Sequence, residues 1–246
     1  IDDDRWLIRM ADPVTHKNVW KSRMFRGPAR AADRELAAMV ADVEGTTPTA
    51  GRRTFLHPTL ISGAVMPQRV DAHAGAPQSV YSDHFLDSLA LDGPAGFKLE
   101  VPPVHPILAA TTLPGFGAGH AALMAKFAHL QVVIALLRDG FHPDSHGGRV
   151  LLRGDGSPQL DYAMTDYLWE GARRALLAMA EIQFAAGAAS VLPIHEDAKP
   201  LGSWKEAKTA IAALPMRALR TRVASAHVMG GCAMGPDPSK SVVDES

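Results

Sequence analysis

The chain has 246 residues, of which 47% are hydrophobic and 21% are charged. This composition is typical of a globular protein with a sizeable buried core, and it excludes disordered and fibrous proteins. The formal net charge of −1 provides no basic surplus for binding phosphate backbones or anionic lipid, so we expect no nucleic-acid partner.

Cysteine content and hydropathy indicate the cellular compartment of the protein and whether it spans a membrane. Cys232 is the only cysteine, which excludes an intrachain disulfide and favours a reducing compartment. No apolar run approaches the roughly 18 residues that a membrane span needs, and the first residues lack the apolar core of a signal peptide. The sequence therefore predicts a cytoplasmic protein without a membrane span.

Residues 1–50 carry scattered charges, one predicted helix from Asp33 to Val43 and no recognisable chemistry, so this segment stays unassigned. Short β-prone runs separated by proline and glycine follow. Apolar and polar residues alternate in several of them, as over 97–101, which indicates antiparallel strands with one buried face. The predicted strands are 59–66, 79–85, 97–101, 131–138 and 149–152.

Three helices are predicted among and after these strands. A weak one covers about 118–128, and a strong amphipathic one runs from Thr165 or Asp166 to Ala186, before Gly187. A third begins with the capping box of Ser203 and Glu206 and ends at Leu214, before a proline. Because no regular βαβ alternation occurs, the expected class is α+β, with a mainly antiparallel sheet, helices on one face and no complete Rossmann domain.

Several motifs could carry chemistry, and each has a structural alternative. GFGAGH at 115–120 has His120 at the position of the third glycine in the dinucleotide-binding pattern GxGxxG, and no predicted strand precedes it. A flexible loop is therefore favoured. HPDSH at 142–146 offers alternating ligand types, but its proline and the following glycines favour a turn, and we expect no metal site. Cys232 is five residues after His227, a spacing that does not ensure contact. Other histidines, including His57 and His105, are expected to be structural.

The densest constellation is SAHVMGGCAMG at 225–235. His227 is followed by Gly230 and Gly231, which allow positive φ and close approach of the backbone to a ligand. Two interpretations are equally balanced on these residues alone: a histidine presented beside a tightly packed ligand, or a glycine-rich loop over the core.

This segment resembles the C-terminal motif of the glucose-methanol-choline (GMC) family of flavin-dependent oxidoreductases, HxxGxCxMG followed by DP and VVD. Further similar stretches are GRRTFLHP at 51–58, GAPQSVYSDHF at 75–85, GFKLEVPPVHP at 96–106 and LLRDGFHPDS at 136–145. Together they resemble bacterial relatives of long-chain alcohol oxidases over about 51–246.

The resemblance implies an FAD-dependent enzyme acting on the CH–OH group of a hydrophobic alcohol, with long-chain alcohols among the candidates. It gives His227 the role of catalytic base and places Gly230 and Gly231 against the flavin. Residues 51–224 would then form the substrate-binding domain, and 225–246 an active-site segment that returns to a flavin domain.

The GxGxxG motif that holds FAD in the family and the segment with the second catalytic residue are both absent. We therefore expect a substrate-binding part that is inactive alone. The alternative is a non-catalytic binding or interaction domain derived from such an enzyme.

Overall fold

The computed structural model describes residues 5–11, 20–26, 50–237 and 239–243. The predicted helix at 33–43 lies outside these residues. The chain divides into two compact units, which are described separately: unit 1 comprises 1–55, 146–163 and 228–246, and unit 2 comprises 56–145 and 164–227.

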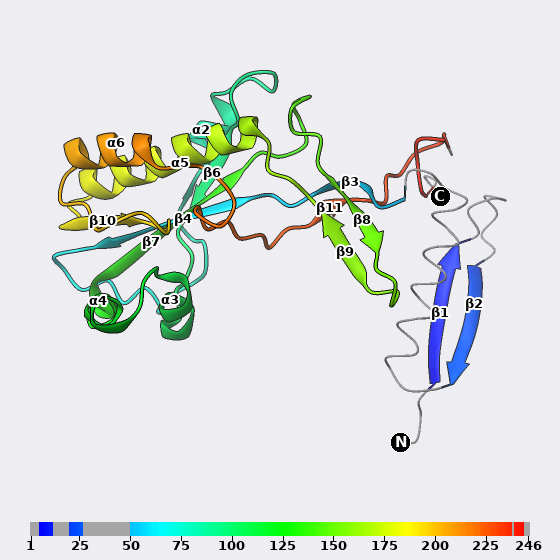
Figure 1. Ribbon diagram of the computed structural model, residues 1–246, viewed down its shortest axis with the longest axis horizontal. Helices are drawn as coiled ribbons and strands as arrows, with labels where there is room; N and C mark the ends of the chain where they lie inside the picture. The colour runs from blue at the N-terminus through cyan, green and yellow to red at the C-terminus, as the bar shows by residue number, and fades with distance from the viewer. Residues whose placement is uncertain (1–4, 12–19, 27–49, 238, 244–246) are drawn as a thin grey trace. The chain divides into compact units, whose positions relative to one another are not determined.

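Unit 2 is built on a five-stranded antiparallel sheet with the strand order β10-β4-β7-β6-β5 (Figure 1). Its strands are β4 (Thr59–Val65), β5 (Tyr81–Ser82), β6 (Phe97–Glu100), β7 (Leu130–Leu137) and β10 (Ser190–Pro193). The central pair is β4 and β7, in which Thr59 lies opposite Leu136 and Val65 opposite Leu130. Both strands are rich in β-branched and apolar residues, as expected for strands covered on both faces.

Helix α5 (Asp166–Ala185) lies across one face of this sheet and buries residues spaced three and four apart, among them Leu168, Ala172 and Met179. Thr165 caps its first turn by accepting the Leu168 N–H at 3.4 Å. On the sheet side, buried Ser62 of β4 donates its hydroxyl to Gln183 of α5 at 2.7 Å. Helix α5 therefore faces the even-numbered side chains of β4.

Helix α6 (Trp204–Ala213) packs beside α5 and is capped at Ser203, whose Oγ accepts the Glu206 N–H at 3.2 Å. Helices α3 (Pro106–Thr112) and α4 (Gly117–Met124) lie on the other side of the sheet (Figure 1). The short helix α2 (His84–Asp87) and the 3₁₀ turn η1 (Phe127–His129) complete unit 2.

Unit 1 contains a four-stranded antiparallel sheet with the order β11-β3-β8-β9. Its strands are β3 (Arg52–Phe55), β8 (Gly148–Leu152), β9 (Pro158–Asp161) and β11 (Met229–Gly230). A separate antiparallel pair joins β1 (Arg5–Ala11) and β2 (Trp20–Arg26).

The α+β class and antiparallel pairing predicted from the sequence are confirmed, and every named strand pair in the described part of the chain is antiparallel. The two longer helices share one face of the unit 2 sheet, while α3 and α4 flank the other. Strands β4, β6, β7 and β8 and helices α5 and α6 agree with the predicted segments within one or two residues.

Two predicted segments need correction. The strand expected over 79–85 is only two residues long, because Asp83 is followed by α2. The helix expected over 118–128 ends at Met124, after which the chain turns through η1 into β7.

Candidate functional site

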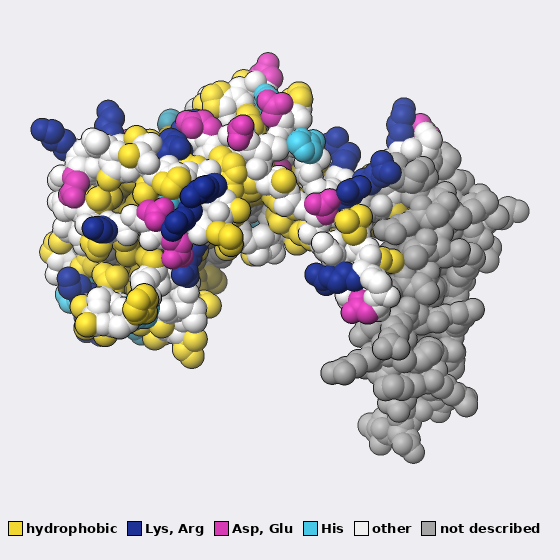
Figure 2. All heavy atoms as spheres, in the orientation of Figure 1, with side chains coloured by type: hydrophobic (Ala, Val, Ile, Leu, Met, Phe, Trp, Pro, Cys, Tyr) yellow, Lys and Arg dark blue, Asp and Glu magenta, His cyan; other side chains and the backbone are white. Residues whose placement is uncertain are grey.

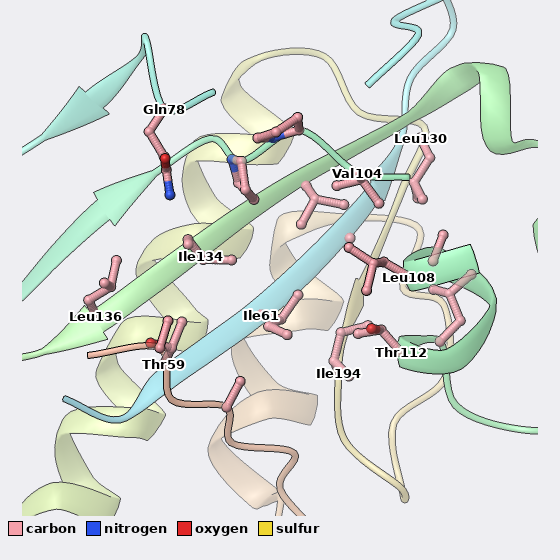
Figure 3. A pocket seen from close by; sticks show the side chains of 18 of the residues that line it. Thr59, Ile61, Gln78, Val104, Leu108, Thr112, Leu130, Ile134, Leu136 and Ile194 are labelled. Atoms are coloured by element: carbon pink, nitrogen blue, oxygen red, sulfur yellow. The ribbon is translucent and has the colours of Figure 1, made fainter. Parts of the chain in front are cut away.

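Unit 2 contains a cavity of about 300 Å³ between its sheet and helix α3. Its wall is almost entirely apolar, and polar side chains enter it from Thr59, Gln78, Thr112, Ser225 and His227. Figure 3 shows side chains from β4, β7 and α3 directed into the same space, with Gln78 on a loop at the opposite side. The remaining residues that line it are Ile61, Gly63, Pro102, Pro103, Val104, Leu108, Ala109, Leu113, Leu130, Val132, Ile134, Leu136, Ile194, Ala224 and Ala226.

Strand register explains why this wall is apolar. Ile61 of β4 lies opposite Ile134 of β7, and Gly63 lies opposite Val132, so these residues share the sheet face that α5 does not cover. Helix α3 closes the space with Leu108, Ala109 and Thr112. Figure 2 shows hydrophobic side chains exposed over the region of α3 and α4. Ile107 of α3 and Phe116, which precedes α4, are both exposed. The cavity is suited to an apolar ligand body.

An antiparallel bridge brings the segment that precedes His227 to the start of β4. The N–H of Thr59 donates to the Ala224 carbonyl at 2.9 Å, and the N–H of Ala224 donates to the Thr59 carbonyl at 3.0 Å. His227 follows as an exposed residue that borders the cavity. The imidazole ring of His227 is therefore placed beside the apolar cavity.

The same bridge brings His227 to His57. Their Nδ1 atoms lie 2.9 Å apart, and the two rings stack with centroids separated by 5.2 Å at an interplanar angle of 29°. His57 is half-buried and has φ of 51°, a left-handed backbone conformation that is uncommon outside glycine and marks a constrained position.

Hydrogen bonds to Leu56 hold the backbone immediately before His57. Its N–H donates to Asp139 Oδ2 at 3.2 Å, and its carbonyl accepts the Ser225 hydroxyl. Asp139 is itself buried and accepts the Ser145 hydroxyl at 2.5 Å through Oδ1. Both histidines are thus tied to one network, since Ser225 stands two residues before His227.

Electrostatics favour the neutral form of His57. Burial lowers the pKa of His57 most, and the neighbouring His227 ring lowers it further. Asp139 and Glu100 act in the opposite direction, since their negative charges favour the imidazolium form.

Gly230 and Gly231 have φ of 76° and 77° and pack against their own unit. A Cβ on Gly230 would lie 2.0 Å from the Arg53 carbonyl oxygen, and one on Gly231 would lie 3.0 Å from Thr54 Oγ1. The Gly51 N–H donates to the Gly231 carbonyl at 2.7 Å. Close pairing with β3 is therefore a sufficient local reason for glycine here.

The other motifs take structural roles. His142 accepts the Asp144 N–H at 3.1 Å within a turn and stacks on Tyr167 with ring centroids 4.2 Å apart. Within the described ranges, no group of three or more acidic, histidine or cysteine side chains could hold a metal ion. GFGAGH spans the end of the link from α3 and the first turn of α4, and Cys232 is an exposed free thiol.

The sequence interpretation missed His57, which it treated as one of several structural histidines. Its position in GRRTFLHP, a segment of the family resemblance, was the available signal. Asp139, Ser145 and Ser225 also lie in segments of the resemblance, at 136–145 and 225–235, but their hydrogen-bond partnerships could not be predicted, because Leu56 is distant in the chain.

The comparisons with known proteins concern mainly the C-terminal part. Residues 143–246 match the family model described as GMC oxidoreductase, which represents the C-terminal domain of that family. No curated protein matches the chain significantly. No helix in the described part of the chain is both long and apolar enough to cross a membrane. The matched region includes β8, β9, α5, α6 and the motif around His227, so this part of the chain is similar to the C-terminal domain of GMC oxidoreductases.

Proposed function

We propose that this protein acts in the FAD-dependent oxidation of a hydrophobic alcohol, with His227 as the base that removes the hydroxyl proton. The observation that carries the proposal is the position of His227 beside the apolar cavity of about 300 Å³. An alcohol with a long apolar body would fill this cavity and present its hydroxyl group to the imidazole ring of His227.

The reaction divides between the protein and the cofactor. FAD, when bound, supplies the acceptor for the hydride that leaves the carbinol carbon. This chain's own residues bind the apolar body, orient the hydroxyl group and take its proton on the His227 ring. Imidazole suits that step because its ordinary pKa of about 6.5 lets it accept a proton near neutral pH.

The described residues do not themselves form a dinucleotide phosphate cradle. Gly115 precedes helix α4, which contains Gly117 and Gly119, and this segment follows helix α3. No glycine-rich turn in the described ranges follows a strand and opens a helix. The proposed contact of Gly230 and Gly231 with the flavin is supported by their place in the GMC motif, since their packing against β3 is explained locally.

Spectroscopy with FAD tests the proposal. We expect the protein, assayed together with an FAD-binding domain of the GMC family, to keep flavin bound through dialysis, and anaerobic addition of primary alcohols to bleach that flavin, faster as the alkyl chain lengthens. His227→Asn should slow bleaching by about 10²- to 10⁴-fold while alcohol binding persists. Alcohol binding without any bleaching would contradict oxidation and support the alternative, a non-catalytic binding domain, which the cavity alone would also serve.

A further inference from the structure

The hydrogen bond between His57 and His227 decides which nitrogen of His227 can meet a ligand. Their Nδ1 atoms are 2.9 Å apart, so Nδ1 of His227 is already engaged. A bond between two imidazole nitrogens requires one N–H and one lone pair. The nitrogen of His227 left for a ligand is therefore Nε2.

Two arrangements of the proton satisfy this hydrogen bond. If His57 donates, neutral His227 has its lone pair on Nδ1 and its hydrogen on Nε2, and Nε2 cannot accept a proton. If His227 donates, its Nε2 holds the lone pair. Only the second arrangement is compatible with a base.

We infer that His57 is a positioning residue that accepts the Nδ1–H of His227 and so keeps Nε2 as the proton-accepting atom. The inference rests on the proposed role of His227. In the proton-transfer step the O–H bond of the alcohol breaks, its electron pair stays on oxygen, and the His227 Nε2 lone pair forms the new N–H bond. The resulting imidazolium keeps its Nδ1–H bond to neutral His57, so no second proton moves.

The surroundings of His57 suit an acceptor. Burial and the His227 ring lower the pKa of His57, which favours its neutral form, and Nδ1 of that form accepts a hydrogen bond when the ring hydrogen is on Nε2. The carboxylates of Asp139 and Glu100 act in the opposite direction, since their negative charges favour a positive charge on His57. Two adjacent imidazolium rings would repel each other, so a positive charge on the His227 ring favours neutral His57.

The backbone at His57 is also fixed. Leu56 is held through its N–H by Asp139 and through its carbonyl by Ser225, so the ring of His57 is presented from an anchored segment. A fixed outer partner of this kind orients a functional histidine and determines its tautomer.

Ring-nitrogen NMR of the purified protein tests the inference directly. We expect His227 at neutral pH to carry its hydrogen on Nδ1, with Nε2 unprotonated. Two variants and a control extend the measurement. His57→Asn retains an acceptor near the Nδ1 position and tolerates the left-handed backbone, while His57→Phe keeps a ring without an acceptor. His105→Asn alters another histidine that precedes a proline and does not line the cavity.

His57→Asn should preserve the His227 tautomer, His57→Phe should give a mixture of tautomers, and His105→Asn should change nothing. A hydrogen on Nε2 of His227 in the unmodified protein would overturn the inference, and so would unchanged His227 shifts in His57→Phe. The unmodified protein alone decides the first point, even if a variant does not fold.

Activity separates this inference from the proposed function. Under the proposed function, His57→Phe should lower flavin bleaching by about 10- to 100-fold, and His57→Asn should restore most of it. The expected tautomer without any alcohol oxidation would refute the function and leave the positioning role intact. Oxidation that needs His227 but occurs with a hydrogen on Nε2 in the resting protein would refute the positioning role alone.

Discussion

Nδ1 of His57 lies 2.9 Å from Nδ1 of His227, although 170 residues separate them in the chain. The bridge between Thr59 and Ala224 aligns the two segments, and Leu56 connects them further through Ser225. The histidine pair therefore depends on backbone pairing at the start of β4, next to the apolar cavity.

Replacement of His227 by alanine should remove the proposed base without unfolding unit 2, because this side chain is exposed. We expect alcohol-dependent flavin bleaching to fall by about 10²- to 10⁴-fold. The free energy of unfolding, measured by thermal denaturation, should change by less than about 0.5 kcal/mol. His84→Ala, at an exposed histidine of α2, serves as the control and should leave bleaching unchanged.

Leu108→Trp should weaken alcohol binding, because Leu108 lines the cavity and a larger ring would occupy ligand space. We expect the Kd of a long-chain alcohol, measured by calorimetry, to rise by about 10-fold, which corresponds to about 1.4 kcal/mol. Ile107→Trp is the matched control, since Ile107 is the preceding residue of α3, is exposed and does not line the cavity. Equal effects of the two substitutions would argue against this cavity as the binding site.

Asp139→Ala should destabilise unit 2. The substitution leaves the Leu56 N–H and the buried Ser145 hydroxyl without their acceptor, at a cost of about 1–3 kcal/mol. Chemical denaturation provides the measurement, and exposed Asp92→Ala provides a control with the same change of charge. Matching unfolding midpoints for the two variants would show that the Asp139 network contributes nothing.

The depressed pKa of His57 predicts a pH dependence of stability. Because the unfolded chain takes up this proton at a higher pH than the folded chain, the folded state loses relative stability as pH falls below about 6.5. The loss continues until pH passes below the folded pKa and then levels off. His57→Asn should flatten this part of a plot of unfolding free energy against pH, and an unchanged slope would exclude His57 as its source.

Gly230→Ala should disrupt the pairing of β11 with β3. A Cβ would lie 2.0 Å from the Arg53 oxygen, in addition to the strain of φ at 76°. Gly75→Ala is the matched control, because Gly75 has φ of 94° but a Cβ there meets nothing within 4 Å. We expect the control to cost about 1–2 kcal/mol from strain alone and Gly230→Ala to cost more. Hydrogen exchange at Thr54 should report the difference.

Local patterns predicted the main elements of unit 2 because their signals lie within short stretches. The apolar runs of β4 and β7, the spacing of Leu168, Ala172 and Met179, and the Ser203 cap depend on neighbours in the sequence. The capping box is shifted by one residue, since Glu206 Oε2 accepts the Gly202 N–H at 2.9 Å. Strands β3 and β9 are short and largely polar, and β11 has only two residues, so their pairing depends on partners that local propensity does not report.

The α+β class, the positions of the long helices and the chemical character of the segment around His227 could be predicted from the sequence, because hydrophobic periodicity, capping residues and a dense motif are local properties. Only the tertiary structure decided that odd-numbered residues of β4 and even-numbered residues of β7 share one apolar wall, and that His57 is the partner of His227. Register and long-range backbone pairing produce both results, and neither is encoded in the spacing of residues within one segment.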